Sequence, residues 1–237
     1  SDNFITISQN TFNNYFNGIV VWRNILKSNT NSYIDIYQNE IQAWGAGTVA
    51  LAIGLFDVYH GSNGTITIYE NKIFNSYKGI MAMNVANTDG WGIGSNEIEI
   101  RYSPAAPINC AGIELIDCEA AGIQYNCNII CTTPNIPSNP AADVAGIYIY
   151  NSRGIEVVSN RIENTTRALT FEGNCTALAS PTIYTKVISN HFHESKYGLY
   201  MLNNAVIGQQ GCTSPSCHLV TENMWFANFN FHTYVNN

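Results

Sequence analysis

Two glutamates and an aspartate stand where outward-facing side chains could act on a sugar chain. Glu114 directly follows Ile113, and Glu172 comes three residues after Leu169. If Ile113 and Leu169 point into a core, both glutamates point outward, because side chains alternate along a strand. Paired carboxylates are the groups that glycosidic cleavage requires. With Asp117, a turn residue close to Glu114, they are the candidate catalytic residues.

Aromatic residues occupy similar outward positions and suggest binding of sugars without cleavage. An aromatic ring offers a flat apolar surface with a polar tip, which suits stacking against a sugar. The residues expected to form such a glycan-binding surface are Trp22, Tyr148, Tyr150 and Tyr200.

Metal and nucleophile chemistry find little support in the motifs. His191 and His193 flank Phe192 and share one strand face, but no third ligand stands at a matching place. The chain contains no C-x-x-C motif and no Gly-x-Ser-x-Gly elbow. We therefore predict no metal site and no cofactor.

The seven cysteines favour an oxidising compartment. Cys212 and Cys217 bracket a turn-rich Thr-Ser-Pro-Ser insert and are the disulfide candidate. The alternative is that several cysteines are small buried apolar residues. We expect a secreted or cell-surface protein.

Composition limits the partners and the fold class. The 237 residues are 46% hydrophobic and only 11% charged, with a net charge of −7. Ten Lys and Arg argue against nucleic acid as a partner. No window of about 18 apolar residues exists, so no membrane span is expected. The 32 asparagines and 18 glycines favour turns over helices, which indicates an all-β chain.

One repeat positions all these residues. The template reads apolar, any, apolar, any, any, Asn, any, apolar, as in Ile66, Ile68, Asn71 and Ile73. Period two in each apolar pair predicts a strand, and stacking of such units predicts a solenoid with aliphatic columns inside. The recurrent asparagine is expected to take the left-handed conformation at a corner and to hydrogen-bond to the asparagine of the next rung. The predicted ladder is Asn10, Asn39, Asn71, Asn96, Asn128, Asn160, Asn190 and Asn223.

The repeat resembles the right-handed parallel β-helix family of pectate lyases, polygalacturonases, phage tailspikes and bacterial surface proteins. The resemblance covers residues 2–235 and implies a single-stranded solenoid of about eight rungs with loop inserts. A glycine followed by Ile or Leu also recurs, as in Gly79-Ile80 and Gly112-Ile113, and marks a strand named the Gly-Ile strand. The resemblance places the family's substrate groove on this strand, which carries Glu114. Polygalacturonase motifs are mostly missing, because Asn87-Thr88-Asp89 has no Asp-Asp, Gly-His-Gly or Arg-Ile-Lys beside it. No capping helix is visible, so residues 1–237 are expected to be one domain within a longer chain or a stacking subunit.

These observations favour a non-catalytic scaffold or adhesive module, with polysaccharide or neighbouring solenoid subunits as partners. The alternatives are a polysaccharide lyase or glycoside hydrolase, or a glycan-binding surface, on the Gly-Ile face. Fold alone does not choose among them.

Overall fold

The computed structural model describes residues 4–23, 25–26, 32–43, 50–60, 64–103, 110–134, 136, 142–179, 182–183, 185–207, 223–226 and 231–235. The named elements in these ranges are β-strands, and the successive strands of each rung belong to three different faces of the solenoid.

The strands form three faces, named here the first, second and third sheets in chain order. The first contains β1 (Phe4–Ser8), β5 (Ser32–Tyr37), β8 (Gly64–Tyr69), the end of β10 (Lys78–Gly94), β13 (Glu119–Gln124), β16 (Glu156–Val158) and β21 (Lys186–Ile188). The second contains β2 (Thr11–Tyr15), β6 (Glu40–Ala43), β9 (Lys72–Ser76), β11 (Glu97–Ile100), β14 (Asn128–Cys131), β17 (Arg161–Glu163), β22 (His191–His193) and β24 (Met224–Phe226). The third contains β3 (Asn17–Trp22), β7 (Leu51–His60), the start of β10, β12 (Cys110–Ile116), β15 (Val144–Tyr150), β18 (Arg167–Asn174), β23 (Tyr197–Val206) and β25 (Phe231–Val235). Short strand β4 (Ile25–Leu26) extends the pairing of β7, and β19 (Leu178–Ala179) and β20 (Thr182–Ile183) form an antiparallel hairpin.

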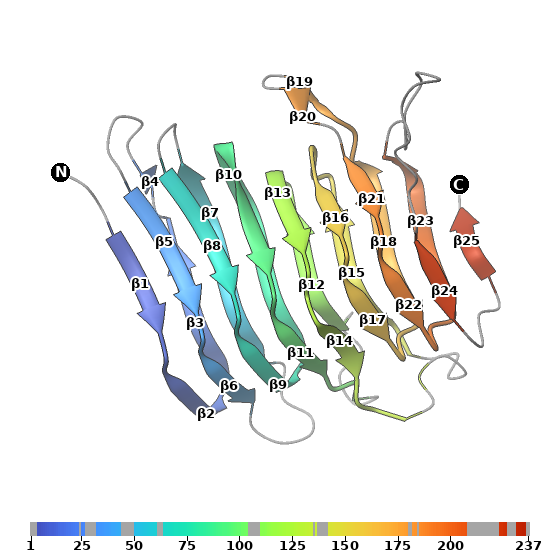
Figure 1. The fold of residues 1–237 in the computed structure, drawn as a ribbon, viewed down its shortest axis with the longest axis horizontal. Coiled ribbons are helices and arrows are strands. Elements are labelled where there is room, and N and C mark those ends of the chain that lie inside the picture. Colours follow the sequence, from blue (N-terminus) through green and yellow to red (C-terminus); the bar gives the residue numbers. More distant parts are fainter. Residues whose placement is uncertain are drawn as a thin grey trace.

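All pairing between successive rungs is parallel, so the chain is the all-β parallel solenoid that the repeat predicted. Figure 1 shows the strands side by side along the long axis, with the N-terminus at one end and the C-terminus at the other. Strand β10 bends from the third sheet into the first and joins their hydrogen bonding. The count of eight rungs stays a prediction, since the first strand of an eighth rung would fall at 218–222, outside the described residues.

Aliphatic columns fill the interior because each rung exposes its inward face until a neighbour covers it. In the first sheet, Ile36 is in register with Ile68 and Ile68 with Ile93, and all three are at most 1% exposed. The same column continues in register through Ile123, Val157 and Val187.

An asparagine ladder runs along one corner of the solenoid, as predicted. The Oδ1 atom of Asn71 accepts hydrogen bonds from both the backbone N–H and Nδ2 of Asn39, at 3.1 and 3.0 Å. Its Nδ2 donates to Oδ1 of Asn96 at 3.0 Å and to the carbonyl of Ile36 at 2.9 Å. Both the donors and the acceptor of each buried amide are thereby satisfied, which is the condition for placing a polar group in a core.

The fifth ladder residue is Asn126, and the prediction of Asn128 was wrong. Asn126 accepts from Asn96 at 3.0 Å and donates to Asn160 at 2.8 Å. Cys127 is one extra residue between the ladder asparagine and β14, because Glu97 pairs with Asn128 and not with Cys127. The insertion moves Ile123, not Tyr125, into the aliphatic column.

At the seven ladder positions whose preceding residue is described, the left-handed conformation belongs to that residue, and not to the asparagine as predicted. Seven such residues have φ between 53° and 57°: Gln9, Gln38, Glu70, Ser95, Tyr125, Ser159 and Ser189. The asparagine is selected for its amide, which bonds to two neighbouring rungs, while the preceding residue makes the turn.

Glycine precedes the aliphatic residue of the third sheet because the corner there is crowded. A Cβ atom on Gly112 would lie 2.4 Å from Cγ2 of Ile129, and one on Gly146 would lie 2.3 Å from Cγ2 of Ile162. No side chain fits at these separations, so the glycines let the second and third sheets close on each other.

Candidate functional site

Glu114 lies on the outer side of the third sheet, as expected, but it is buried and ion-paired. Its Oε1 atom accepts from Nζ of Lys78 at 2.7 Å, and the two side chains are 7% and 12% exposed. Its Oε2 atom is buried and has no hydrogen-bond partner in the described part of the chain. Separating Glu114 from Lys78 would leave a buried charge without a counter-ion, which is energetically costly. The pair therefore restrains the two strands that carry it.

Glu172 lies on the same face but belongs to a different set of contacts. It accepts hydrogen bonds from the Tyr148 hydroxyl and from Nδ2 of Asn203. Burial, followed by the bond to Glu172, raises the pKa of Tyr148 above its ordinary value. Strand spacings put the backbones of Glu114 and Glu172 about 12 Å apart, with Tyr148 between them.

Asp117 sits at the corner that follows the third sheet, with φ of 51° and an exposed side chain. Asn84, Asn151 and Asn203 adopt the same left-handed conformation, with φ between 46° and 54°. The three acidic candidates therefore lie near one face without converging on one point, and their catalytic role stays a prediction.

The aromatic candidates are divided between two regions. Trp22, on β3, is 65% exposed, and its Nε1 donates to Asp57 at 3.3 Å. Tyr148 and Tyr150 lie on β15, about 19 Å away across four strand spacings. Tyr200 is half-buried, with the Arg167 guanidinium 5.5 Å from its ring centre. No continuous platform joins these four residues.

The disulfide candidates Cys212 and Cys217 lie outside the described residues. Within the described part, Cys118 and Cys131 are buried and Cys127 is exposed, and each is a thiol. Burial raises the pKa of the Cys118 thiol to about 12. The alternative prediction, that several cysteines are small buried apolar residues, therefore accounts for Cys118 and Cys131.

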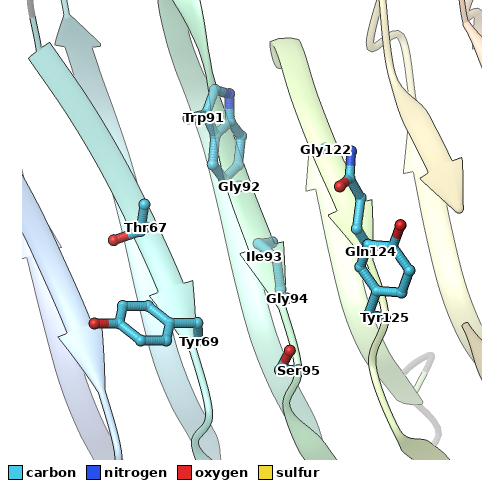
Figure 2. A pocket seen from close by; sticks show the side chains of 10 residues that line it. All are labelled: Thr67, Tyr69, Trp91, Gly92, Ile93, Gly94, Ser95, Gly122, Gln124 and Tyr125. Carbon is cyan, nitrogen blue, oxygen red and sulfur yellow. The ribbon is translucent and has the colours of Figure 1, made fainter. Parts of the chain in front are cut away.

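A trough lies on the outer face of the first sheet. It has a volume of about 290 Å³, and its floor is the bare backbone of β10 at Gly92 and Gly94. Figure 2 shows this floor between the side chains of β8 and those of β13. The Tyr69 ring leans away from the glycines and stacks on Tyr37 at 5.0 Å, so the floor stays uncovered. A second hollow of about 320 Å³ adjoins it and shares Trp91, Gly122 and Gln124.

Gly92 is not required by the fold. A Cβ atom there would meet only the carbonyl oxygen of Gly122, at 3.8 Å, and its φ lies outside the left-handed region. An alanine, or a larger residue pointing outward, would fit the backbone and fill the trough. Steric fit therefore does not account for glycine at position 92, and its effect is to leave the floor of the trough open.

Tyr125 lines the trough on the side of β13 and differs in type from the other left-handed residues that precede ladder asparagines. The equivalent left-handed residues are Gln, Glu or Ser, whereas Tyr125 is a bulky aromatic with φ of 54° and 60% of its surface exposed. Left-handed backbone costs a non-glycine residue roughly 1–2 kcal/mol. The backbone of Tyr125 is strained and its ring is exposed beside a groove, and a binding role can be inferred from this combination.

Sequence reasoning missed the trough because it placed Tyr125 in the core. The available signals were the run Gly92-Ile93-Gly94 and the aromatic that stands immediately before Asn126. Correct alignment of the fifth rung would have turned Tyr125 outward beside those glycines.

No family model, curated protein or solved structure matches the chain. Among the described residues, no helix is long and apolar enough to cross a membrane, and no three His, Cys, Asp or Glu side chains gather as a metal site would need.

Proposed function

We propose that the protein is a non-catalytic adhesive module of a secreted or cell-surface protein. In this proposal eight right-handed coils form a stiff rod, and the trough on the first sheet binds a polysaccharide chain. The observation that carries the proposal is the exposed ring of Tyr125 beside the uncovered backbone of Gly92 and Gly94. A flat ring next to a shallow open floor suits a sugar better than a deep pocket would.

Binding is the better proposal than cleavage because two of the three acidic candidates, Glu114 and Glu172, already have partners within the protein. Glu114 is held by Lys78, and Glu172 is held by Tyr148 and Asn203. The rival hypothesis, a lyase or hydrolase on the third sheet, predicts product release that disappears in Glu114→Gln. We expect no product from neutral or acidic polysaccharides in reducing-end and unsaturated-product assays.

The test is binding to a glycan array by the wild-type protein and two trough variants. Gly92→Trp fills the floor and should lower affinity at least tenfold, whereas Tyr125→Ala removes a stacking surface and should lower it about fivefold to tenfold. Matched controls are Glu40→Trp and Tyr59→Ala, which change exposed residues outside the trough. Circular dichroism establishes that all four variants fold.

Binding lost in both trough variants and kept in both controls would support the proposal. Binding by none of the glycans, or equal loss in Glu40→Trp and Gly92→Trp, would overturn it.

A further inference from the structure

Resting on the proposed function, we infer that the trough selects neutral polysaccharide chains and discriminates against uronate-rich ones. The inference comes from the charges around the two hollows, and not from the aromatic wall that carries the proposed function.

The described lining of both hollows contains no lysine or arginine. Its one charged residue is Glu156, which accepts from Nζ of Lys186 at 2.6 Å and from Nε2 of Gln124 at 3.5 Å. The nearby cation is therefore already committed to a carboxylate of the protein.

The rim repeats this pattern. Asp35 accepts from the Thr67 hydroxyl, and Glu70 accepts from Nε2 of Gln38 at 2.8 Å. Beside the second hollow, Arg153 is paired with Glu119. The lining and rim of the two hollows thus carry four carboxylates against two cations, and both cations are ion-paired: Asp35, Glu70, Glu119 and Glu156 against Arg153 and Lys186.

A uronate in the trough would meet this excess of negative charge, because both cations named in the described lining and rim are already ion-paired. Coulomb repulsion between like charges a few ångströms apart near a protein surface is large enough to lower affinity by at least about tenfold. Hydroxyl groups of a neutral sugar would instead find uncharged partners, because Thr67, Ser95 and Gln124 line the hollow. Ser95 can donate and accept hydrogen bonds, and the Thr67 hydroxyl and the Gln124 amide, which each donate to a carboxylate of the protein, keep oxygen atoms that can accept from a sugar hydroxyl.

The experiment compares hexasaccharides that differ only in charge. Gluco-, manno- and galacto-hexaoses and their C6-oxidised uronate forms are titrated into the full chain by calorimetry at low salt. We expect the best neutral hexaose to bind at least about tenfold more tightly than its uronate form, with the difference shrinking as salt screens the charges.

A charge-reversal variant tests the cause. Glu70→Lys places a cation on the rim and should reduce the neutral-to-acidic affinity ratio at least threefold. Glu40→Lys makes the same change of net charge on the second sheet, where the side chain is also exposed, and should leave the ratio unchanged.

The outcomes separate the two proposals. Uronate forms that bind as tightly as or more tightly than neutral ones would overturn the selectivity and leave glycan binding standing. An equal shift of the ratio in Glu40→Lys and Glu70→Lys would also overturn it, because net charge and not the rim would then be the cause. Binding by no member of either series would overturn the proposed function together with this inference.

Discussion

Replacing Asn126 by alanine removes a complete ladder position. Four hydrogen bonds disappear: two that its Oδ1 accepts from Asn96 and two that its Nδ2 donates, to Asn160 and to the carbonyl of Ile93. At about 1 kcal/mol net for each bond, the free energy of unfolding should fall by about 4 kcal/mol. That is a large part of the stability of an ordinary domain.

Asn128 supplies the matched control, because it lies two residues away and carries the same side chain. Its Oδ1 atom is buried without a hydrogen-bond partner among the described residues. Asn128→Ala should therefore change the free energy of unfolding by no more than about 0.5 kcal/mol, since removing an unsatisfied buried group can offset the lost contacts.

The assay is urea unfolding followed by tryptophan fluorescence, combined with amide hydrogen exchange. Exchange is needed because a solenoid can open rung by rung. The backbone N–H of Asn96 donates to Oδ1 of Asn126 at 3.1 Å, so this amide should lose protection in Asn126→Ala and keep it in Asn128→Ala. A loss of stability in Asn128→Ala equal to that in Asn126→Ala would refute the assignment of the ladder.

Four further predictions concern other parts of the fold. Gly112→Ala should lower the free energy of unfolding by about 1–3 kcal/mol or prevent folding, because its Cβ meets a crowded corner, whereas Gly92→Ala should be near neutral in the same urea experiment. Cys127 should react with iodoacetamide in the folded protein while Cys118 stays protected, as mass spectrometry would show. The folded pKa of Cys118, about 12, lies above its ordinary 9.0, so the folded state keeps this proton when the unfolded chain loses it. Stability should consequently fall as pH rises from about 9 to 12, and a Cys118→Ala variant should show a shallower fall. Tyr125→Gly should raise the free energy of unfolding by roughly 1 kcal/mol in the same urea experiment, through relief of left-handed backbone. A decrease would contradict the assignment of backbone strain to Tyr125.

The fold could be predicted from sequence because each repeat places apolar and asparagine residues at the same spacing. Aliphatic residues at spacing two and an asparagine three positions later recur along the chain, and the structure aligns them as columns and a ladder. Where the period is broken, prediction failed. Asn128 fits the whole template, whereas Asn126 fits only its apolar pair, because the position two residues later is Asn128 and not apolar. The pairing between β11 and β14 shows that Cys127 is inserted.

The trough could not be predicted for the same reason. When Asn128 is taken as the ladder residue, the template predicts that Ile123 and Tyr125 both point inward. In the structure the Tyr125 ring is exposed. The partners of Glu114 were also beyond sequence reasoning, because Lys78 lies on a different rung, 36 residues earlier. Such contacts depend on the register between strands and not on local pattern.

The most direct test of the binding account is a two-dimensional NMR titration of the nitrogen-15-labelled protein with the neutral hexaose that binds best. We predict that the amide signals that move first are those of the trough: Gly92, Gly94, Gly122 and Tyr125. Signals that move instead on the third sheet, with the trough glycines unchanged, would contradict the account; the residues to watch there are Trp22, Tyr148, Tyr150 and Tyr200.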